Sequence, residues 1–184
     1  VPMTATLPLL DFTDLPRFDA VTPDQVEAAI GELLQRAEQA LETVTAPDFP
    51  ADWARMAGML DVATEQLGRA WGVISHLNAV ADTPELRAAY NQALPRITDF
   101  WTRLGADERL FAKYRAMDSH QLDAAQQQAL KNALRNFVLS GAELVGDAKT
   151  RFAQIQERQA ELGQKFSENV LDATNAWEML VPTE

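Results

Sequence analysis

Residues 22–45 read TPDQVEAAIGELLQRAEQALETVT and show the pattern of one long amphipathic helix. Thr22, Pro23 and Gln25 form a typical start, with a capping residue, a proline at the first helical position and a glutamine three residues after the cap. The apolar residues that follow keep a period of 3.6: Val26, Ala29, Ile30, Leu33, Leu34, Ala37, Leu41 and Val44. The run therefore predicts a helix that ends near Thr45, before two prolines, and buries one face.

Similar patterns continue along the chain. They predict further helices over residues 52–80, 84–104, 123–139 and 146–179, and a short one over 107–117. Whether Gly105 separates that short helix from the preceding one stays open. Pro95 should kink the helix that contains it, because proline removes a backbone donor and crowds the preceding turn.

Three further expectations concern local detail. The glycines of the second helix should permit close helix contact: Gly58, Gly68 and Gly72. The helix over 123–139 should turn Leu130, Leu134, Phe137 and Val138 inward and stop at Ser140-Gly141. In the last helix, a set of residues at alternating spacings of three and four resembles a coiled-coil seam: Phe152, Ile155, Gln159, Leu162, Phe166, Asn169 and Ala173.

The composition agrees with a helical chain. Ala and Leu together number 52 among the 184 residues, against 15 for Val plus Ile, and β-branched residues are the ones that favour strands. The prolines among residues 1–21 argue against a helix there and predict an extended arm. We therefore expect an all-α single domain over 1–184: a bundle of about five to six antiparallel helices over 22–180, with an extended N-terminal arm and a long final helix.

Charge and residue types narrow the function classes. The net charge of −11 argues against nucleic acid and anionic membranes as partners. The absence of cysteine removes disulfides, thiolate nucleophiles and cysteine-ligated metals. No apolar run is long enough to span a bilayer, and residues 1–10 lack the features of a signal peptide. These observations predict a cytoplasmic location.

The sequence assigns no catalytic and no metal-ligating residue, and it leaves substrate-binding residues unknown. The only histidines are His76 and His120, and neither begins a His-Glu-x-x-His motif. No glycine precedes a lysine, and no serine has glycine at both second neighbours. These absences argue against a zinc peptidase helix, a phosphate-binding loop and a nucleophile elbow within this chain.

Three polar features have both a functional and a structural interpretation. His76 could act as a ligand or as an acid–base group, but a structural role near a helix end is favoured. Seven acids could bind cations or basic peptides but are better explained as the exposed faces of two helices: Glu32, Glu38, Glu42, Asp48, Asp52, Asp61 and Glu65. For the last helix, contact with a partner and an ordinary exposed face stay equally open: Gln159, Asn169, Asn175 and Trp177.

Several motifs occur in the order found in a known family. They are Pro8-Leu9-Leu10, Leu15-Pro16-Arg17-Phe18, Thr22-Pro23-Asp24-Gln25-Val26, Ser75-His76-Leu77-Asn78-Ala79-Val80, Thr83-Pro84-Glu85-Leu86-Arg87-Ala88-Ala89-Tyr90, Leu94-Pro95, Asn132-Ala133-Leu134-Arg135-Asn136-Phe137, Leu139-Ser140-Gly141 and residues 162–174. In this order, and over nearly the whole chain, they resemble the N-terminal region of the thimet oligopeptidase/neurolysin-like family of zinc metallopeptidases.

The resemblance implies a non-catalytic part of a longer enzyme. Family members carry a His-Glu-x-x-His zinc motif far downstream. The resemblance therefore implies that the chain is inactive alone and has no cofactor of its own. Zinc would be bound only in the longer parent enzyme. The implied role is part of the wall of a channel that admits short peptides. The implied partner is the missing C-terminal catalytic region of the same polypeptide.

Two alternatives and one physical expectation remain. The chain could be a free-standing helical protein-binding or adaptor module that uses its arm and last helix, or a small enzyme of unknown type. If a partner region is missing, we expect self-association or an exposed apolar patch, involving the first 20 residues or the final helix.

Overall fold

The computed structural model describes residues 7–180, and within that range every regular element is helical. The elements are η1 (Pro8–Leu10), η2 (Phe18–Ala20), α1 (Pro23–Thr45), α2 (Trp53–Met56), η3 (Ala57–Asp61), α3 (Val62–Val80), α4 (Pro84–Gly105), α5 (Glu108–Arg115), η4 (Ser119–Gln121), α6 (Ala124–Leu139) and α7 (Gly146–Ala176). The all-α prediction is confirmed. Residues 1–6 of the predicted arm and residues 181–184 of the predicted domain lie outside the described residues.

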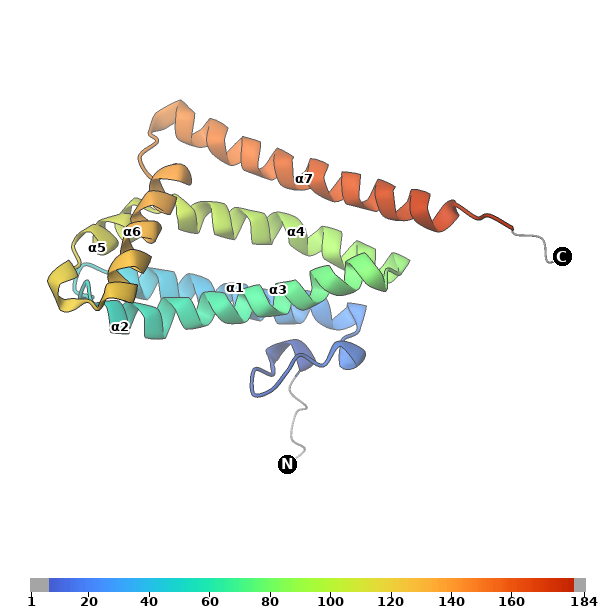
Figure 1. The fold of residues 1–184 in the computed structure, drawn as a ribbon, viewed down its shortest axis with the longest axis horizontal. Helices are drawn as coiled ribbons and strands as arrows, with labels where there is room; N and C mark the ends of the chain where they lie inside the picture. Colours follow the sequence, from blue (N-terminus) through green and yellow to red (C-terminus); the bar gives the residue numbers. More distant parts are fainter. Residues whose placement is uncertain (1–6, 181–184) are drawn as a thin grey trace.

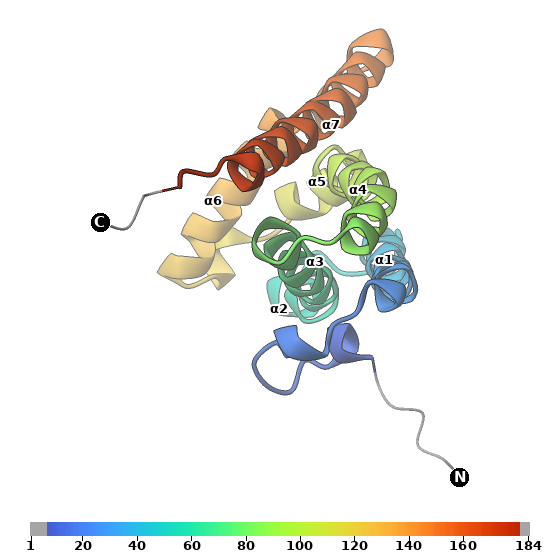
Figure 2. The ribbon, with the colours of Figure 1, turned by 90° about the vertical axis from the view of Figure 1, so that its right-hand side faces the viewer.

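Three long helices form the centre of the molecule. α1, α3 and α4 lie side by side and run in alternating directions (Figure 1). The shorter α5 and α6 cover one end of this group, and α7 runs along the outer side of α4 (Figure 2). Within residues 7–180, no helix combines the length and the apolar character that a membrane crossing requires.

Two apolar clusters hold these helices together. The first joins α1, α3 and α4, and its fully buried residues include Ile30, Ile74 and Phe100. The second lies at the end where α5 and α6 meet α1, around Leu110 and Phe137. α1 supplies residues to both clusters. Its apolar stripe from Val26 to Val44 therefore connects the two parts of the core.

The helix starts differ in how they are capped. α1 begins at Pro23 as predicted, but the Thr22 side chain makes no capping hydrogen bond, and the Gln25 N–H donates to the Thr22 carbonyl instead, at 3.1 Å. The Asp123 carboxylate does cap α6 by accepting from the Gln126 N–H. The Asp123 N–H in turn donates to the Gln126 side chain, which completes a capping box. The hydroxyl of Thr83 caps α4.

The predicted helix over 52–80 is interrupted by one wider π-type turn, η3, between α2 and α3. The prediction for its glycines is wrong. A methyl group at Gly58, Gly68 or Gly72 would meet no atom within 4 Å, because all three face solvent. The close approach occurs elsewhere, at Gly105.

Gly105 is the last residue of α4, so it does separate α4 from the short helix α5. A Cβ at Gly105 would lie only 2.9 Å from the Cβ of Ser140, at the end of α6. Gly141 then has φ of +88°, a conformation that stops α6 where predicted. Of the four residues expected to face inward from α6, Leu130 and Phe137 are buried and Leu134 is partly buried, but Val138 is 45% exposed. Val138 faces solvent because it follows Phe137 directly and so points to another side of the helix.

The segment before α1 lies across the helices, with two short 3₁₀ turns in an otherwise irregular path. Leu9 is buried against α1 and α3. The Arg69 guanidinium donates to the carbonyl of Asp14 and lies over the ring of Phe12. Leu15 and Phe18 stay exposed, so part of the predicted apolar arm is left uncovered.

Candidate functional surface along the last helix

The last helix, α7, lies against the bundle, but none of its own residues is buried. α7 contributes no buried side chain, although it is the longest helix of the described chain. The side chains that it turns towards the bundle are half-buried and mostly polar or small: Phe152, Gln156, Ala160, Gln164, Glu168 and Leu171. This row is too polar for a hydrophobic core, so α7 lies on the surface of the molecule.

The predicted seam of α7 lies mainly on the opposite, outer side. Ile155, Leu162 and Val170 are 47–49% exposed, and Phe166 is 70% exposed. Gln159 and Asn169 are both exposed, and Asn169 also lines a groove between α4 and α7, so both interpretations of these residues stay open. We call Ile155, Leu162, Phe166 and Val170 the outer apolar row. Together with exposed Trp177, Met179 and Leu180, it confirms the prediction of an exposed apolar face in the final helix.

Polar contacts fasten α7 to the bundle. Arg87 of α4 donates to Asp172 of α7 at 2.6 Å and to Asp82, before α4, also at 2.6 Å. Asn91 Nδ2 donates to Glu168 Oε1 at 2.8 Å. Hydrogen bonds from Arg87 lower the pKa of Asp172. The pairing spans α4 and α7 and orients the C-terminal half of α7.

A groove lies on each side of this contact. The first, about 490 Å³, runs between α4 and α7 and is lined by polar and small residues that include Asn91, Pro95, Thr98, Ala160 and Gln164. The second, about 430 Å³, lies between the end of α3 and the C-terminal half of α7. These grooves present hydrogen-bonding groups and short apolar patches to whatever covers them.

The two histidines lie in separate elements. His76 is exposed on α3, and its ring meets the ring of Phe18 edge-on, with 5.4 Å between centroids. His120 lies in η4, where its backbone N–H donates to Asp118. Among residues 7–180, no three His, Asp or Glu side chains are grouped so that they could hold a metal ion. The described residues therefore do not fit a zinc site.

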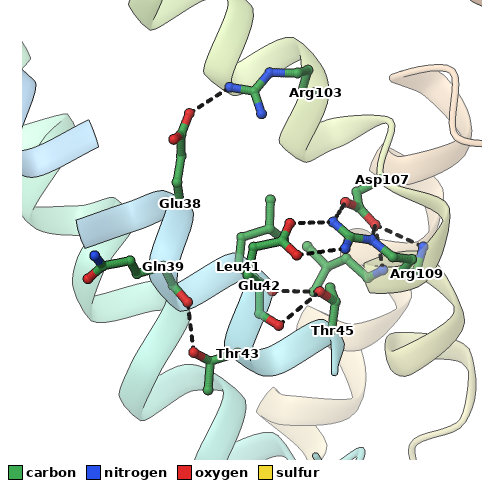
Figure 3. Close-up of polar contacts among 10 residues, drawn as sticks. Glu38, Gln39, Leu41, Glu42, Thr43, Thr45, Arg103, Asp107 and Arg109 are labelled. Carbon is green, nitrogen blue, oxygen red and sulfur yellow. Dashed lines mark hydrogen bonds and ion pairs between the residues drawn. The ribbon is translucent and has the colours of Figure 1, made fainter. Parts of the chain in front are cut away.

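The acids singled out from the sequence are all exposed, as expected, but two of them pair with arginines of other helices (Figure 3). Glu38 accepts from Arg103 of α4 at 2.8 Å. Glu42 accepts two hydrogen bonds from Arg109 of α5, at 2.9 and 2.8 Å. These contacts join α1 to α4 and α5. The sequence pattern gave no signal for them, because the partners lie more than 60 residues apart.

Two of the remaining acids make local contacts. Glu32 pairs with Arg36 one turn further along α1. The Asp52 carboxylate caps α2 by accepting from the Arg55 N–H at 2.9 Å. No arrangement of these carboxylates brings three together around one point within the described chain.

Comparison with known proteins identifies one family model and several relatives that the chain resembles. The family model described as the N-terminal domain of neurolysin/thimet oligopeptidase matches residues 30–149. Oligopeptidase A of Salmonella typhimurium is 40% identical over 183 residues, which cover 97% of this chain and 27% of the relative. Oligopeptidase A of Escherichia coli is 38% identical with the same coverage.

A plant relative gives a similar result. The probable cytosolic oligopeptidase A of Arabidopsis thaliana is 37% identical over 178 residues, which cover 95% of this chain and 25% of the relative. The chain thus spans about a quarter of the length of the curated relatives that it matches. The match extends over the arm, the bundle and α7 together.

Proposed function

Because this chain belongs to the neurolysin/thimet oligopeptidase family and matches its N-terminal domain, we propose that it is the non-catalytic helical part of a zinc metalloendopeptidase acting on short oligopeptides. The observation that carries the proposal is the 40% identity to an oligopeptidase A along nearly the whole chain. We assign the zinc ligands to no residue of this chain, and the metal would supply its chemistry in the catalytic region.

The outer apolar row of α7 is the surface that we assign to contact with that catalytic region. Four apolar side chains in a row on one helix form a face that a folded protein normally covers. Arg151, Arg158 and Lys165 recur at seven-residue intervals and line one edge of the row. A matching surface would be apolar with carboxylates along one edge.

The groove between α4 and α7 is the part that we assign to the channel wall. Asn91, Gln164 and Thr98 line it with amide and hydroxyl groups, which can hydrogen-bond to the backbone of an extended peptide. Pro95 lies in the same wall and has no N–H, so the carbonyl of Asn91 loses its usual partner within α4. Such a surface suits peptides of varied sequence.

A chimera tests the proposal. The N-terminal quarter of Salmonella typhimurium oligopeptidase A is replaced by this chain, and hydrolysis of a quenched fluorescent peptide is measured. We expect a folded and active chimera. Phe166→Asp should abolish activity by preventing docking, whereas Leu139→Asp should not, since Leu139 is also 70% exposed but lies on α6. A folded but inactive chimera would contradict the assigned role, and equal activity of both variants would contradict docking through α7.

The isolated chain tests the non-catalytic part of the proposal. Incubated with zinc and the same peptide, it should show no hydrolysis above the background. His76→Ala and His120→Ala variants serve as controls for any activity that does appear. Zinc-dependent turnover that disappears in either variant would show that this chain carries its own catalytic centre.

A further inference from the structure

The second groove has a polar floor and an apolar wall. Its floor comes from the end of α3 and the residues after it, with Ser75, Asn78 and Asp82. Its wall is formed by Tyr90 of α4 and by Phe166 and Val170 of α7. The volume of about 430 Å³ suits a small molecule or the end of a short peptide and is too small for a folded partner.

Two oxygen atoms at this floor lack hydrogen-bond donors. Asn78 is only 9% exposed, and its Oδ1 accepts no hydrogen bond from any described residue. Asp82 Oδ1 is likewise buried and unpaired, whereas its Oδ2 accepts from Arg87 at 2.6 and 3.1 Å. Buried acceptors are normally satisfied, and an unpaired one costs free energy that a bound donor recovers. Both atoms are buried beneath the groove surface, so a ligand reaches them only when their side chains rotate.

The charges around the groove favour a cation as that donor. Asp82, Arg87 and Glu168 line it, and Arg87 also pairs with Asp172, which lies outside the groove lining. Two carboxylates and one guanidinium therefore line the groove, which leaves a negative surplus. An anionic or purely apolar ligand would be disfavoured here, and a group that carries both a positive charge and N–H donors would fit.

We propose that this groove binds a primary ammonium group attached to an apolar residue, as found at the amino terminus of a short peptide. The ammonium would donate to Asn78 Oδ1 and Asp82 Oδ1 once these side chains rotate towards the groove. The apolar side chain of the first residue would lie against Phe166 and Val170. Phe166 and Val170 also belong to the outer apolar row, so the site is tested in the isolated chain, where nothing covers that row.

The direct test uses the tripeptide Leu-Gly-Gly as the probe. It is titrated into the ¹⁵N-labelled chain, and backbone and side-chain amide shifts are followed by NMR. We expect shifts at Asn78, Asp82, Phe166 and Val170, and none with N-acetylated Leu-Gly-Gly, which lacks the ammonium group. Binding should weaken above about pH 8, where an α-amino group loses its proton.

A second probe distinguishes the source of the ammonium group. Nα-acetyl-lysine amide carries its ammonium on a side chain and keeps it to about pH 10. Binding of this probe alone would overturn the assignment to a peptide terminus. No binding of Leu-Gly-Gly, with the Asn78 amide N–H found hydrogen-bonded to Asp82, would overturn the site itself, because the two floor residues would then satisfy each other.

Two substitutions should change the affinity in opposite directions. Asn78→Asp has nearly the same shape and adds a carboxylate, so it should tighten Leu-Gly-Gly binding. Asp82→Asn should weaken it about tenfold, the usual effect of losing one charged hydrogen bond. Asp99→Asn is the control, because it removes the same charge from an acid that pairs with Arg103 away from this groove. Equal affinities for all three variants would contradict the proposal, and general damage to the fold could not explain a tighter Asn78→Asp.

Discussion

Gly105 shows how a single hydrogen atom in place of a side chain can set the distance between two helices. Its position at the end of α4 lies against Ser140, and a Cβ there would come within 2.9 Å of the Ser140 Cβ and 3.0 Å of its Oγ. Real side chains almost never approach so closely, so either helix end would have to move. The glycines at 58, 68 and 72 play no such role, because they face solvent.

Gly105→Ala should therefore destabilise the chain by about 1–3 kcal/mol, the usual cost of overpacking a close contact. Gly163→Ala is the matched control. It lies within α7 with open space around it, so it should stabilise by up to about 1 kcal/mol through helix propensity. The free energy of unfolding in urea measures both. An unchanged stability of Gly105→Ala would show that α4 and α6 tolerate a wider separation.

At the scale of the element, α7 combines a polar inner side with an apolar outer side, the reverse of an ordinary surface helix. Gln156, Gln164 and Glu168 face the bundle, while Leu162 and Phe166 are exposed. The spacing of three and four residues is the same for a face that packs inward and for one that awaits a partner. The arrangement explains why α7 is held by ion pairs such as Arg87 with Asp172.

An exposed apolar row should make the isolated chain self-associate as its concentration rises. Sedimentation velocity over a wide concentration range measures this, and Phe166→Asp should shift the chain towards monomer. Val138→Asp, at an exposed apolar position on α6, should leave the association unchanged. A strict monomer at high concentration would show that the outer apolar row tolerates water without pairing.

On the scale of the whole molecule, ion pairs between helices link distant parts of an acidic chain. Arg109 joins α5 to Glu42 of α1 and to Asp107, and these hydrogen bonds lower the pKa of Glu42. For Asp107, burial opposes ionisation, but hydrogen bonds from Arg109 and from backbone N–H groups outweigh it and lower the pKa. Both carboxylates bind protons less readily in the folded chain than in the unfolded one.

Stability should therefore fall in acid. Because the pKa of each carboxyl is lowered on folding, the contribution is present above the ordinary values of 4.5 for Glu42 and 3.8 for Asp107 and is lost as the pH falls below them. Arg109→Gln should reduce this pH dependence, by less than about 1 kcal/mol because the pair with Glu42 is largely exposed. The pH dependence of stability is measured by thermal unfolding of both proteins between pH 3 and pH 7, which includes the range where the carboxyls titrate.

Arg158→Gln is the control for that experiment. It removes the same charge from an arginine whose partner, Glu161, lies in the same helix. An equal loss of pH dependence in both variants would mean that net charge, and not the pairing between helices, governs stability in acid.

The sequence by itself determined the helices of this protein and the family to which it belongs. Helix starts such as Pro23 and Asp123 and the stop at Gly141 depend on residues within one or two turns, so local chemistry predicts them. The family motifs are likewise runs of neighbouring residues.

Only the tertiary structure decided which faces meet. It placed the α7 seam on the outside, brought Gly105 against Ser140, joined Arg109 to Glu42 across the bundle and left two acceptors unpaired beneath the second groove. Each of these features depends on residues far apart in the chain. Helical periodicity shows that a face is apolar, but it does not show whether another part of the chain covers that face, because coverage depends on how all the helices pack together.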